Sequence, residues 1–274
     1  MGSLQHSRVG SGPPLLLIHG IGSWGRCWDP VVPLLAPHRH VITVDLPGFG
    51  GTPMKPGQDM TAAGLARTVA DFLREIGVER PHVAGNSLGG WVGLELARAG
   101  AVASVTGLSP AGLWRSAPRY MRMQVRMLRQ APLALGDRGV RAVAAVAPLR
   151  YAAIANVFGR PWKLSRAEGL AQVQAVRACA GFESVLYAGE HRRFTGGMAI
   201  DVPVTITFGG RDLIFFGPAC RLREELPAQT RWISPPRGWG HLPTWDDPRG
   251  VADLLLAGSA SAVPAVRLRD AAAG

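Results

Sequence analysis

The sequence predicts an α/β fold in which a mostly parallel, twisted sheet carries helices on both faces. Three observations lead to this prediction: short apolar runs alternate with helical patterns, glycine-rich turns follow several of the runs, and 47% of the 274 residues are hydrophobic. Short, continuously apolar runs are typical of strands that are buried on both faces, as in parallel sheets. A chain of this length and composition can bury one large core, which favours one domain with an insertion over two independent domains.

Strands and helices can be assigned in order along the chain from this pattern. An amphipathic helix is predicted over 62–76, where apolar residues recur at helical spacing, and a closing helix is predicted over 251–256. Six strands are expected, at 15–19, 41–45, 83–84 with its flanking residues, 102–108, 202–208 and 230–234.

The middle of the chain departs from the alternation of strands and helices. Residues 111–199 are helical in pattern, rich in Met and Arg, and interrupted by prolines. They are predicted to form a helical cap that is inserted between two parts of an α/β core, residues 1–110 and 200–258. The last segment, 259–274, is rich in Ala and Ser and is predicted to be a flexible tail.

Positive charge is concentrated in the predicted cap. The net charge is +11, and residues 111–200 hold thirteen Arg and one Lys against four acidic residues. A solvated helical face is the simplest interpretation, and attraction of anionic substrates or association with an anionic membrane surface are the alternatives. No nucleic-acid-binding motif accompanies the charge, so a nucleic-acid partner is not expected. Five arginines recur at spacings of three and four residues, on one predicted helix face: Arg115, Arg119, Arg122, Arg126 and Arg129.

Cysteine usage and hydropathy bear on location and on metal binding. Cys27, Cys179 and Cys220 are odd in number and lack the spacing of metal ligands, as expected of reduced thiols in a cytoplasmic protein. No apolar run approaches the ~20 residues that a membrane-spanning helix needs. We therefore expect a cytoplasmic protein without a metal site or a membrane span.

Residues 85–89 read Gly-Asn-Ser-Leu-Gly, a G-x-S-x-G motif between an apolar run and a helical run. This is the setting of a nucleophile elbow, in which a strand ends, turns sharply and continues as a helix. Gly85 and Gly89 would remove side chains that collide where the strand and helix cross. Ser87 is therefore a candidate nucleophile.

A serine hydroxyl needs a neighbouring base and a third group that orients this base. Asp212 follows a predicted strand and a glycine turn, and His241 lies in a loop after the last predicted strand. We predict that Asp212 orients His241 and that His241 takes the proton from Ser87. Asp246 and Asp247 are assigned instead to the start of the following helix, where negative charge is favourable.

The chain from about residue 15 to residue 256 resembles the α/β-hydrolase family. His19-Gly20 resembles that family's oxyanion loop, 45–50 its D-x-P-G-x-G turn, and 209–212 and 240–241 its acid and histidine segments. The resemblance implies an oxyanion hole formed by the backbone N–H groups of Ile21 and Leu88. It also implies more strand than residues 1–13 can supply, so we expect the first strand of the sheet to be absent or the start to be truncated.

Two interpretations from other functional classes compete with this one. Residues 20–25 fit the G-x-G-x-x-G fingerprint of dinucleotide binding, with Asp45 at the end of the next strand, although prolines at 30 and 33 disfavour the required helix. This oxidoreductase alternative leaves Ser87, Asp212 and His241 unexplained. A hydrolase-like protein that binds ligands without turnover is the other alternative, because fold does not fix function.

By the family resemblance, a serine at the elbow suits acyl transfer, whereas dehalogenases and epoxide hydrolases use an aspartate there. We predict an esterase with a small-molecule ester substrate and without a cofactor, and the alternative is a C–C bond hydrolase of diketones. The oligomeric state and the physiological substrate stay open. An apolar acyl pocket is expected under the cap, with four candidate lining residues: Trp91, Trp114, Met121 and Met127.

Overall fold

The computed structural model describes residues 4–234 and 237–260. The strands of its sheet are β1 (His6–Val9), β2 (Pro14–Ile18), β3 (His40–Val44), β4 (His82–Asn86), β5 (Ser104–Leu108), β6 (Val204–Thr207) and β7 (Arg231–Ile233). They form one seven-stranded sheet in the order β1-β3-β2-β4-β5-β6-β7, in which every neighbouring pair except β1 and β3 is parallel. The predicted α/β fold is therefore confirmed, and all six predicted strands are present.

The edge strand β1 corrects the expectation that the first strand is absent. It runs antiparallel to β3, so that His6 is paired with Val44 and Val9 with Val41. Three of its four residues are exposed, because an edge strand has only one neighbour and this one is covered on neither face. Its residues consequently show no apolar alternation, which is the signal by which strands are recognised in a sequence.

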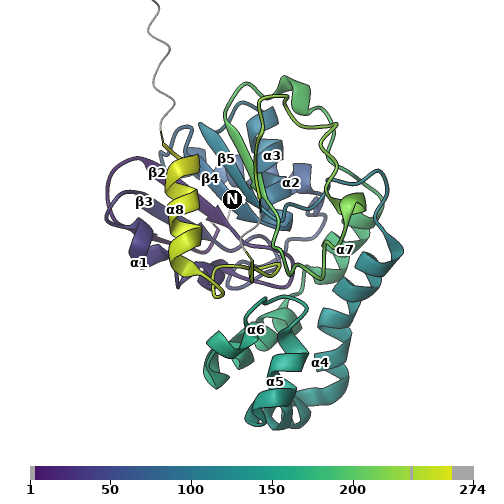
Figure 1. The fold of residues 1–274 in the computed structure, drawn as a ribbon. Coiled ribbons are helices and arrows are strands. Elements are labelled where there is room, and N and C mark those ends of the chain that lie inside the picture. Colours follow the sequence, from purple (N-terminus) through teal and green to yellow (C-terminus); the bar gives the residue numbers. More distant parts are fainter. Residues whose placement is uncertain (1–3, 235–236, 261–274) are drawn as a thin grey trace, which may run out of the picture.

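Both faces of the sheet are buried, as expected from the continuously apolar strands. Along β2, alternate side chains enter different apolar clusters: Leu16 and Ile18 enter one, and Leu15 and Leu17 enter the other. The helices α2 (Ala62–Glu75) and α3 (Leu88–Arg98) cover the first face (Figure 1). The helices α1 (Val32–Leu35) and α8 (Pro248–Gly258) cover the second face (Figure 1).

Four α-helices occupy the chain between β5 and β6: α4 (Arg119–Ala145), α5 (Ala147–Ile154), α6 (Arg166–Ala178) and α7 (Phe182–Glu190). Of these, α4, α5 and α6 pack on one another in a lobe beside the sheet (Figure 1). The long helix α4 contains Pro132 and bends at Gly136, whose φ of +63° lies in the left-handed region that favours glycine. The division into a core (1–110 and 200–258) and a cap (111–199) stays a prediction, and below the cap means the helices α4 to α7.

Short 3-10 helices complete the elements of the described residues. They are η1 (Gly25–Trp28), η2 (Pro161–Lys163), η3 (Gly197–Ala199) and η4 (Pro218–Cys220).

The predicted flexible tail, 259–274, lies mostly outside the described residues. Its first residue, Ser259, is buried at the end of α8, where its hydroxyl donates to the Leu255 carbonyl at 2.7 Å. The same hydroxyl accepts a hydrogen bond from Arg39 at 3.1 Å. Ser259 therefore belongs to the folded core, and residues 261–274 are not described.

Candidate active site

Ser87 lies at the sharp turn between β4 and α3, with a backbone φ of +54°. A non-glycine residue with positive φ is uncommon, and such strain is found at functional sites. The turn is tight enough that a Cβ on Gly85 would lie 2.2 Å from the Gly89 carbonyl oxygen, and one on Gly89 would lie 2.1 Å from the Ile18 carbonyl oxygen. These two positions therefore require glycine for a steric reason.

Asp212 follows β6 and is almost completely buried. Its Oδ1 accepts hydrogen bonds from the backbone N–H groups of Ile214 at 3.0 Å and Phe215 at 2.8 Å. Burial raises the pKa of Asp212, but the charge and hydrogen bond of His241, together with the Phe215 amide, outweigh it, so the pKa lies below its ordinary value. The residue is therefore a carboxylate at neutral pH.

His241 lies in the loop after β7, and its Nδ1 is 3.0 Å from Asp212 Oδ2. Because a carboxylate can only accept, Nδ1 carries the proton and Nε2 is left as an acceptor. The Phe215 ring packs edge-on against the imidazole at a centroid distance of 4.7 Å. The side chain of Asp212 and the ring of Phe215 thus fix the tautomer and the orientation of His241.

Asn86, which the sequence reasoning did not select, links the nucleophile turn to the histidine loop. Its side-chain amide is buried and donates to the carbonyl oxygens of His241 at 2.7 Å and Leu108 at 3.1 Å. The backbone N–H of Ser87 donates to the same Leu108 carbonyl at 3.0 Å. The ends of β4 and β5 and the histidine loop are therefore held together next to Ser87.

His19 organises the loop in which the first oxyanion donor is predicted. The backbone N–H of Leu46 donates to His19 Nε2 at 3.0 Å, so Nδ1 carries the proton and donates to the Gly20 carbonyl at 2.7 Å. Burial lowers the pKa of His19 and outweighs the opposing effects of the Gly20 carbonyl and of the Asp45 charge, which favours the neutral ring.

The bond from His19 also determines which way the neighbouring amide points. In a trans peptide the C=O and the N–H point in opposite directions, so the Ile21 N–H points away from His19. The Gly20 backbone is close to the nucleophile, because a Cβ on Gly20 would lie 3.1 Å from Ser87 Cβ. The second predicted donor, the Leu88 N–H, is in the first turn of α3. Among the described residues, neither amide donates to a protein acceptor.

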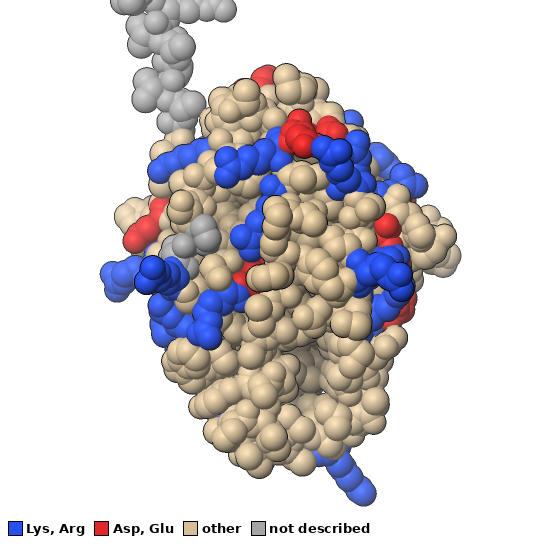
Figure 2. Space-filling model, turned by 45° about the vertical axis from the view of Figure 1, so that its right-hand side comes forward, with Lys and Arg blue, Asp and Glu red and all other residues tan. Residues whose placement is uncertain are grey.

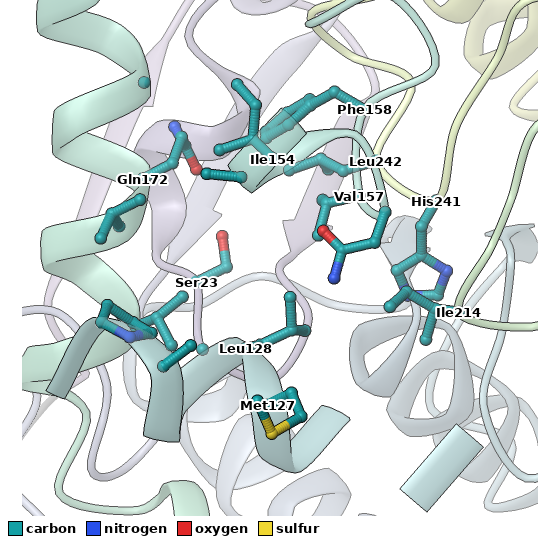
Figure 3. Close-up of a pocket in the computed structure, with 18 of the residues that line it drawn as sticks. Ser23, Met127, Leu128, Ile154, Val157, Phe158, Gln172, Ile214, His241 and Leu242 are labelled. Atoms are coloured by element: carbon teal, nitrogen blue, oxygen red, sulfur yellow. The ribbon is translucent and has the colours of Figure 1, made fainter. Parts of the chain in front are cut away.

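A cavity of about 300 Å³ brings these groups together, since Ile21, Ser87 and His241 all line it. His241 and Ile214 lie at one side and Gln172 at the other (Figure 3). Most of the remaining wall consists of apolar side chains from α4, α5 and α6, such as Leu128 and Ile154. The cavity is therefore an apolar chamber between the core and the cap, with the predicted nucleophile and base on its wall.

The four predicted pocket residues separate into two groups. Met127 lines the cavity, as Figure 3 shows. Trp91, Trp114 and Met121 are buried in the core instead. Trp91 contacts Trp114 edge-on at 5.8 Å and Trp114 contacts Phe215 at 5.8 Å, so the two tryptophans support the ring that packs against His241. Their placement behind His241, rather than in front of it, is the correction to the sequence-based expectation.

Asp246 also has a different position from the one expected. Asp247 is the N-cap of α8, where its side chain accepts from the Gly250 N–H at 3.1 Å, as its place before a helix suggested. Asp246 is fully buried and turned the other way. Its carboxylate accepts from the backbone N–H groups of Gly159, Arg160 and Gly240.

The arginine row of the cap is partly occupied by contacts within the protein. Arg115 pairs with Glu224 at 3.0 Å and Arg126 with Glu190 at 2.7 Å. Arg129 donates to the Val176 carbonyl at 3.1 Å. Figure 2 shows basic groups interspersed with acidic ones, and the lower part of this face, formed by the cap, is almost uncharged and is hollowed. These contacts favour a structural role for the three arginines.

The dinucleotide alternative finds no support in the local geometry. Asp45 accepts hydrogen bonds from the backbone N–H groups of Gly25 at 2.6 Å and Gly51 at 2.8 Å, so its carboxylate is used to hold two turns. The fingerprint requires a helix that opens within the motif, whereas the short 3-10 helix η1 begins only at Gly25.

Two searches of the described residues concern metals and membranes. Within residues 4–234 and 237–260, no group of three or more His, Cys, Asp or Glu side chains is arranged to hold a metal ion. None of the helices described in this part of the chain combines the length and the apolar character needed to cross a membrane.

Comparison with curated proteins finds relatives that act as hydrolases. Over 95 residues the chain is 40% identical to a pimeloyl-[acyl-carrier protein] methyl ester esterase of Aeromonas salmonicida, a match that covers 35% of this chain and 36% of that protein. The chain thus spans about a third of the length of that relative. It is 29% identical over 227 residues to the epoxide hydrolase EphH of Mycobacterium tuberculosis, covering 76% of this chain and 99% of that protein.

Solved structures share the fold at low sequence identity. A thermophilic esterase from Thermogutta terrifontis aligns with a TM-score of 0.63 and 22% identity, covering 93% of this chain and 92% of that one. The enol-lactonase from Burkholderia xenovorans LB400 aligns with a TM-score of 0.69 and 21% identity, covering 92% and 96%. The model of the alpha/beta hydrolase family matches residues 15–254. This chain therefore belongs to the alpha/beta hydrolase family.

Proposed function

We propose that this protein is a serine hydrolase that cleaves carboxylic esters with small to medium acyl groups. The observation that supports it best is the convergence, at one apolar cavity, of a strained serine and a histidine whose Nδ1 faces a buried carboxylate. Two backbone amides without protein acceptors lie beside the same serine. This arrangement supplies the nucleophile, the base, the group that orients the base, and the oxyanion donors that acyl transfer requires.

In the proposed reaction, Ser87 Oγ attacks the ester carbonyl carbon while His241 Nε2 accepts the hydroxyl proton. The carbonyl oxygen becomes an oxyanion that accepts hydrogen bonds from the N–H groups of Ile21 and Leu88. Collapse of this intermediate breaks the C–O bond, and His241 protonates the departing alcohol. Water, deprotonated by His241, then attacks the acyl-enzyme and releases the acid and Ser87. Asp212 stays ionised and stabilises the imidazolium in both halves.

The nucleophile distinguishes this proposal from epoxide opening, although one relative is named an epoxide hydrolase. By the family resemblance, enzymes that open epoxides carry an aspartate at the elbow, whose carboxylate forms an ester with the substrate. This chain carries Ser87 at that position. A serine alkoxide that attacks an acyl carbon leaves an ester that water can hydrolyse, whereas attack on an epoxide carbon would leave a stable ether.

The cavity sets the expected range of acyl groups. If one non-hydrogen atom takes about 30 Å³, the volume of a water molecule in the liquid, then 300 Å³ holds about ten such atoms. Because the wall is mostly apolar, each added methylene that fits should contribute about 0.8 kcal/mol to binding. Butyrate and octanoate esters should therefore be better substrates than acetate esters.

Steady-state hydrolysis of p-nitrophenyl acetate, butyrate and octanoate by the wild type and by Ser87→Ala tests the proposal. We expect turnover by the wild type, a lower KM for the two longer esters, and loss of turnover in Ser87→Ala. Ser184→Ala, at an exposed position of α7, is the matched control and should retain full activity. Absence of turnover by folded wild-type protein, or equal turnover by Ser87→Ala, would contradict the proposal.

A further inference from the structure

A second buried carboxylate contacts the histidine loop from the side opposite Asp212. Asp246 is fully buried, and its Oδ2 accepts hydrogen bonds from the N–H groups of Gly240 at 2.7 Å and Gly159 at 3.0 Å. Its Oδ1 accepts from the Arg160 N–H at 2.7 Å. Gly240 directly precedes His241, and residues 159–160 belong to the segment between α5 and α6 of the cap. One carboxylate therefore joins the cap to the residue next to the proposed base.

The two segments that Asp246 joins are packed backbone against backbone. A Cβ on Gly240 would lie 2.3 Å from the Gly159 nitrogen, and one on Gly159 would lie 2.6 Å from the Gly240 nitrogen. Next to this contact, the Leu242 N–H donates to the Val157 carbonyl at 3.1 Å. At such close approach the N–H groups of Gly159 and Gly240 need a common acceptor, and the Asp246 carboxylate is that acceptor.

The charge of this group is costly to bury. Burial raises the pKa of Asp246, and the hydrogen bonds from Gly240, Gly159 and Arg160 only partly oppose it. Two neighbouring cations, Lys163 and Arg160, donate to the backbone carbonyl of Asp246, at 2.7 Å and 3.4 Å. A buried charge that is not retained for stability alone is typical of a site where placement matters.

We propose that Asp246 is a positioning residue that fixes the His241 loop and the cap segment 157–160 as one unit. The placement of the base then depends on the placement of the cap, whose α4, α5 and α6 form the wall of the acyl cavity. This inference rests on the proposed serine-hydrolase function, because it assigns Asp246 a role in presenting His241 to Ser87.

The test compares Asp246→Asn with Asp247→Asn in the full chain. Both substitutions remove one negative charge, and they are adjacent, but asparagine is as good an N-cap as aspartate, so Asp247→Asn should behave like the wild type. A fluorophosphonate probe that labels Ser87 gives two readouts. The end point counts folded sites, and the rate constant of labelling reports how well His241 activates Ser87.

For Asp246→Asn we expect the labelling end point to be kept, while the labelling rate constant and kcat per labelled site fall about 10- to 100-fold, as for a catalytic group displaced by about 1 Å. A role in folding alone would lower the end point and leave kcat per labelled site unchanged. If Asp246→Asn does not fold, Asp246→Glu decides, because it keeps a carboxylate but places it one methylene further out.

The inference is overturned if kcat per labelled site in the folded variant is within about twofold of Asp247→Asn. It fails separately from the proposed function: wild-type protein that neither reacts with the probe nor hydrolyses esters refutes the function, whereas an active wild type with a normal Asp246→Asn refutes only the role of Asp246.

Discussion

Asn86→Ala should destabilise the protein measurably, because Asn86 carries the link between the nucleophile turn and the histidine loop. The substitution removes the donors to two carbonyls, those of His241 and Leu108. Leu108 keeps the Ser87 N–H as a partner, whereas no other described group donates to the His241 carbonyl. A buried acceptor that is left without a partner costs about 1–3 kcal/mol.

Together with the small void that the shorter side chain leaves, we expect the free energy of unfolding to fall by about 2–3 kcal/mol. For a chain of this size each kcal/mol lowers Tm by about 2–4 °C, so Tm should fall by about 4–12 °C. Urea titration followed by tryptophan fluorescence and a thermal scan by circular dichroism give both quantities.

The matched control is Asn156→Ala. The Asn156 side chain lines the cavity, and its Oδ1 is buried without a partner, so its removal should change the free energy of unfolding by less than about 0.5 kcal/mol. Equal stabilities of Asn86→Ala and Asn156→Ala would refute the reasoning, since they would show that the bond to the histidine loop does not stabilise the fold.

Two further substitutions test the triad and the cavity. Asp212→Asn should lower kcat about 10⁴-fold by favouring the wrong tautomer of His241. Since the pKa of Asp212 is depressed, its ionisation stabilises the wild type at neutral pH, and this contribution is lost as pH falls. The difference in free energy of unfolding between the wild type and Asp212→Asn should therefore shrink from pH 7 to pH 4, and a constant difference would contradict the assigned pairing. Ile154→Ala enlarges the cavity wall and should raise the octanoate-to-butyrate ratio of kcat/KM at a cost of about 2–5 kcal/mol in stability. Val69→Ala, at a buried position of α2 away from the cavity, should lower stability without changing that ratio.

The sequence was sufficient for the fold class and for the family, because both depend on patterns that repeat along the chain. Buried parallel strands such as β2 need continuous apolar runs, and the elbow needs glycine at 85 and 89 for steric reasons that hold in any such turn. The Ser87, Asp212 and His241 assignments were predictions from motif order, and the structure places the three residues at one site.

The parts that sequence reasoning missed have no local pattern. The edge strand β1 is mostly exposed, so its residues do not differ from those of a loop. Trp91 and Trp114 were expected in the pocket because large aromatic residues near a nucleophile suggest ligand contact. Which side of His241 they occupy depends on how β6, the following loop and α4 pack, and no spacing in the sequence records that packing.

Residues that hold a backbone group in place are harder to find than residues that react. Ser87, Asp212 and His241 are recognisable because the chemistry requires those side chains at the ends of particular strands. Asn86 and Asp246 act on backbone N–H and C=O groups, which every residue other than proline has, so nothing in the sequence marks their partners as special. His241 is nevertheless held by contacts from three regions: Asp212 after β6, Asn86 at the end of β4, and Asp246 before α8. A base held from three directions has little freedom to leave its position, and preorganisation of this kind is the part of a catalytic site that only a folded structure displays.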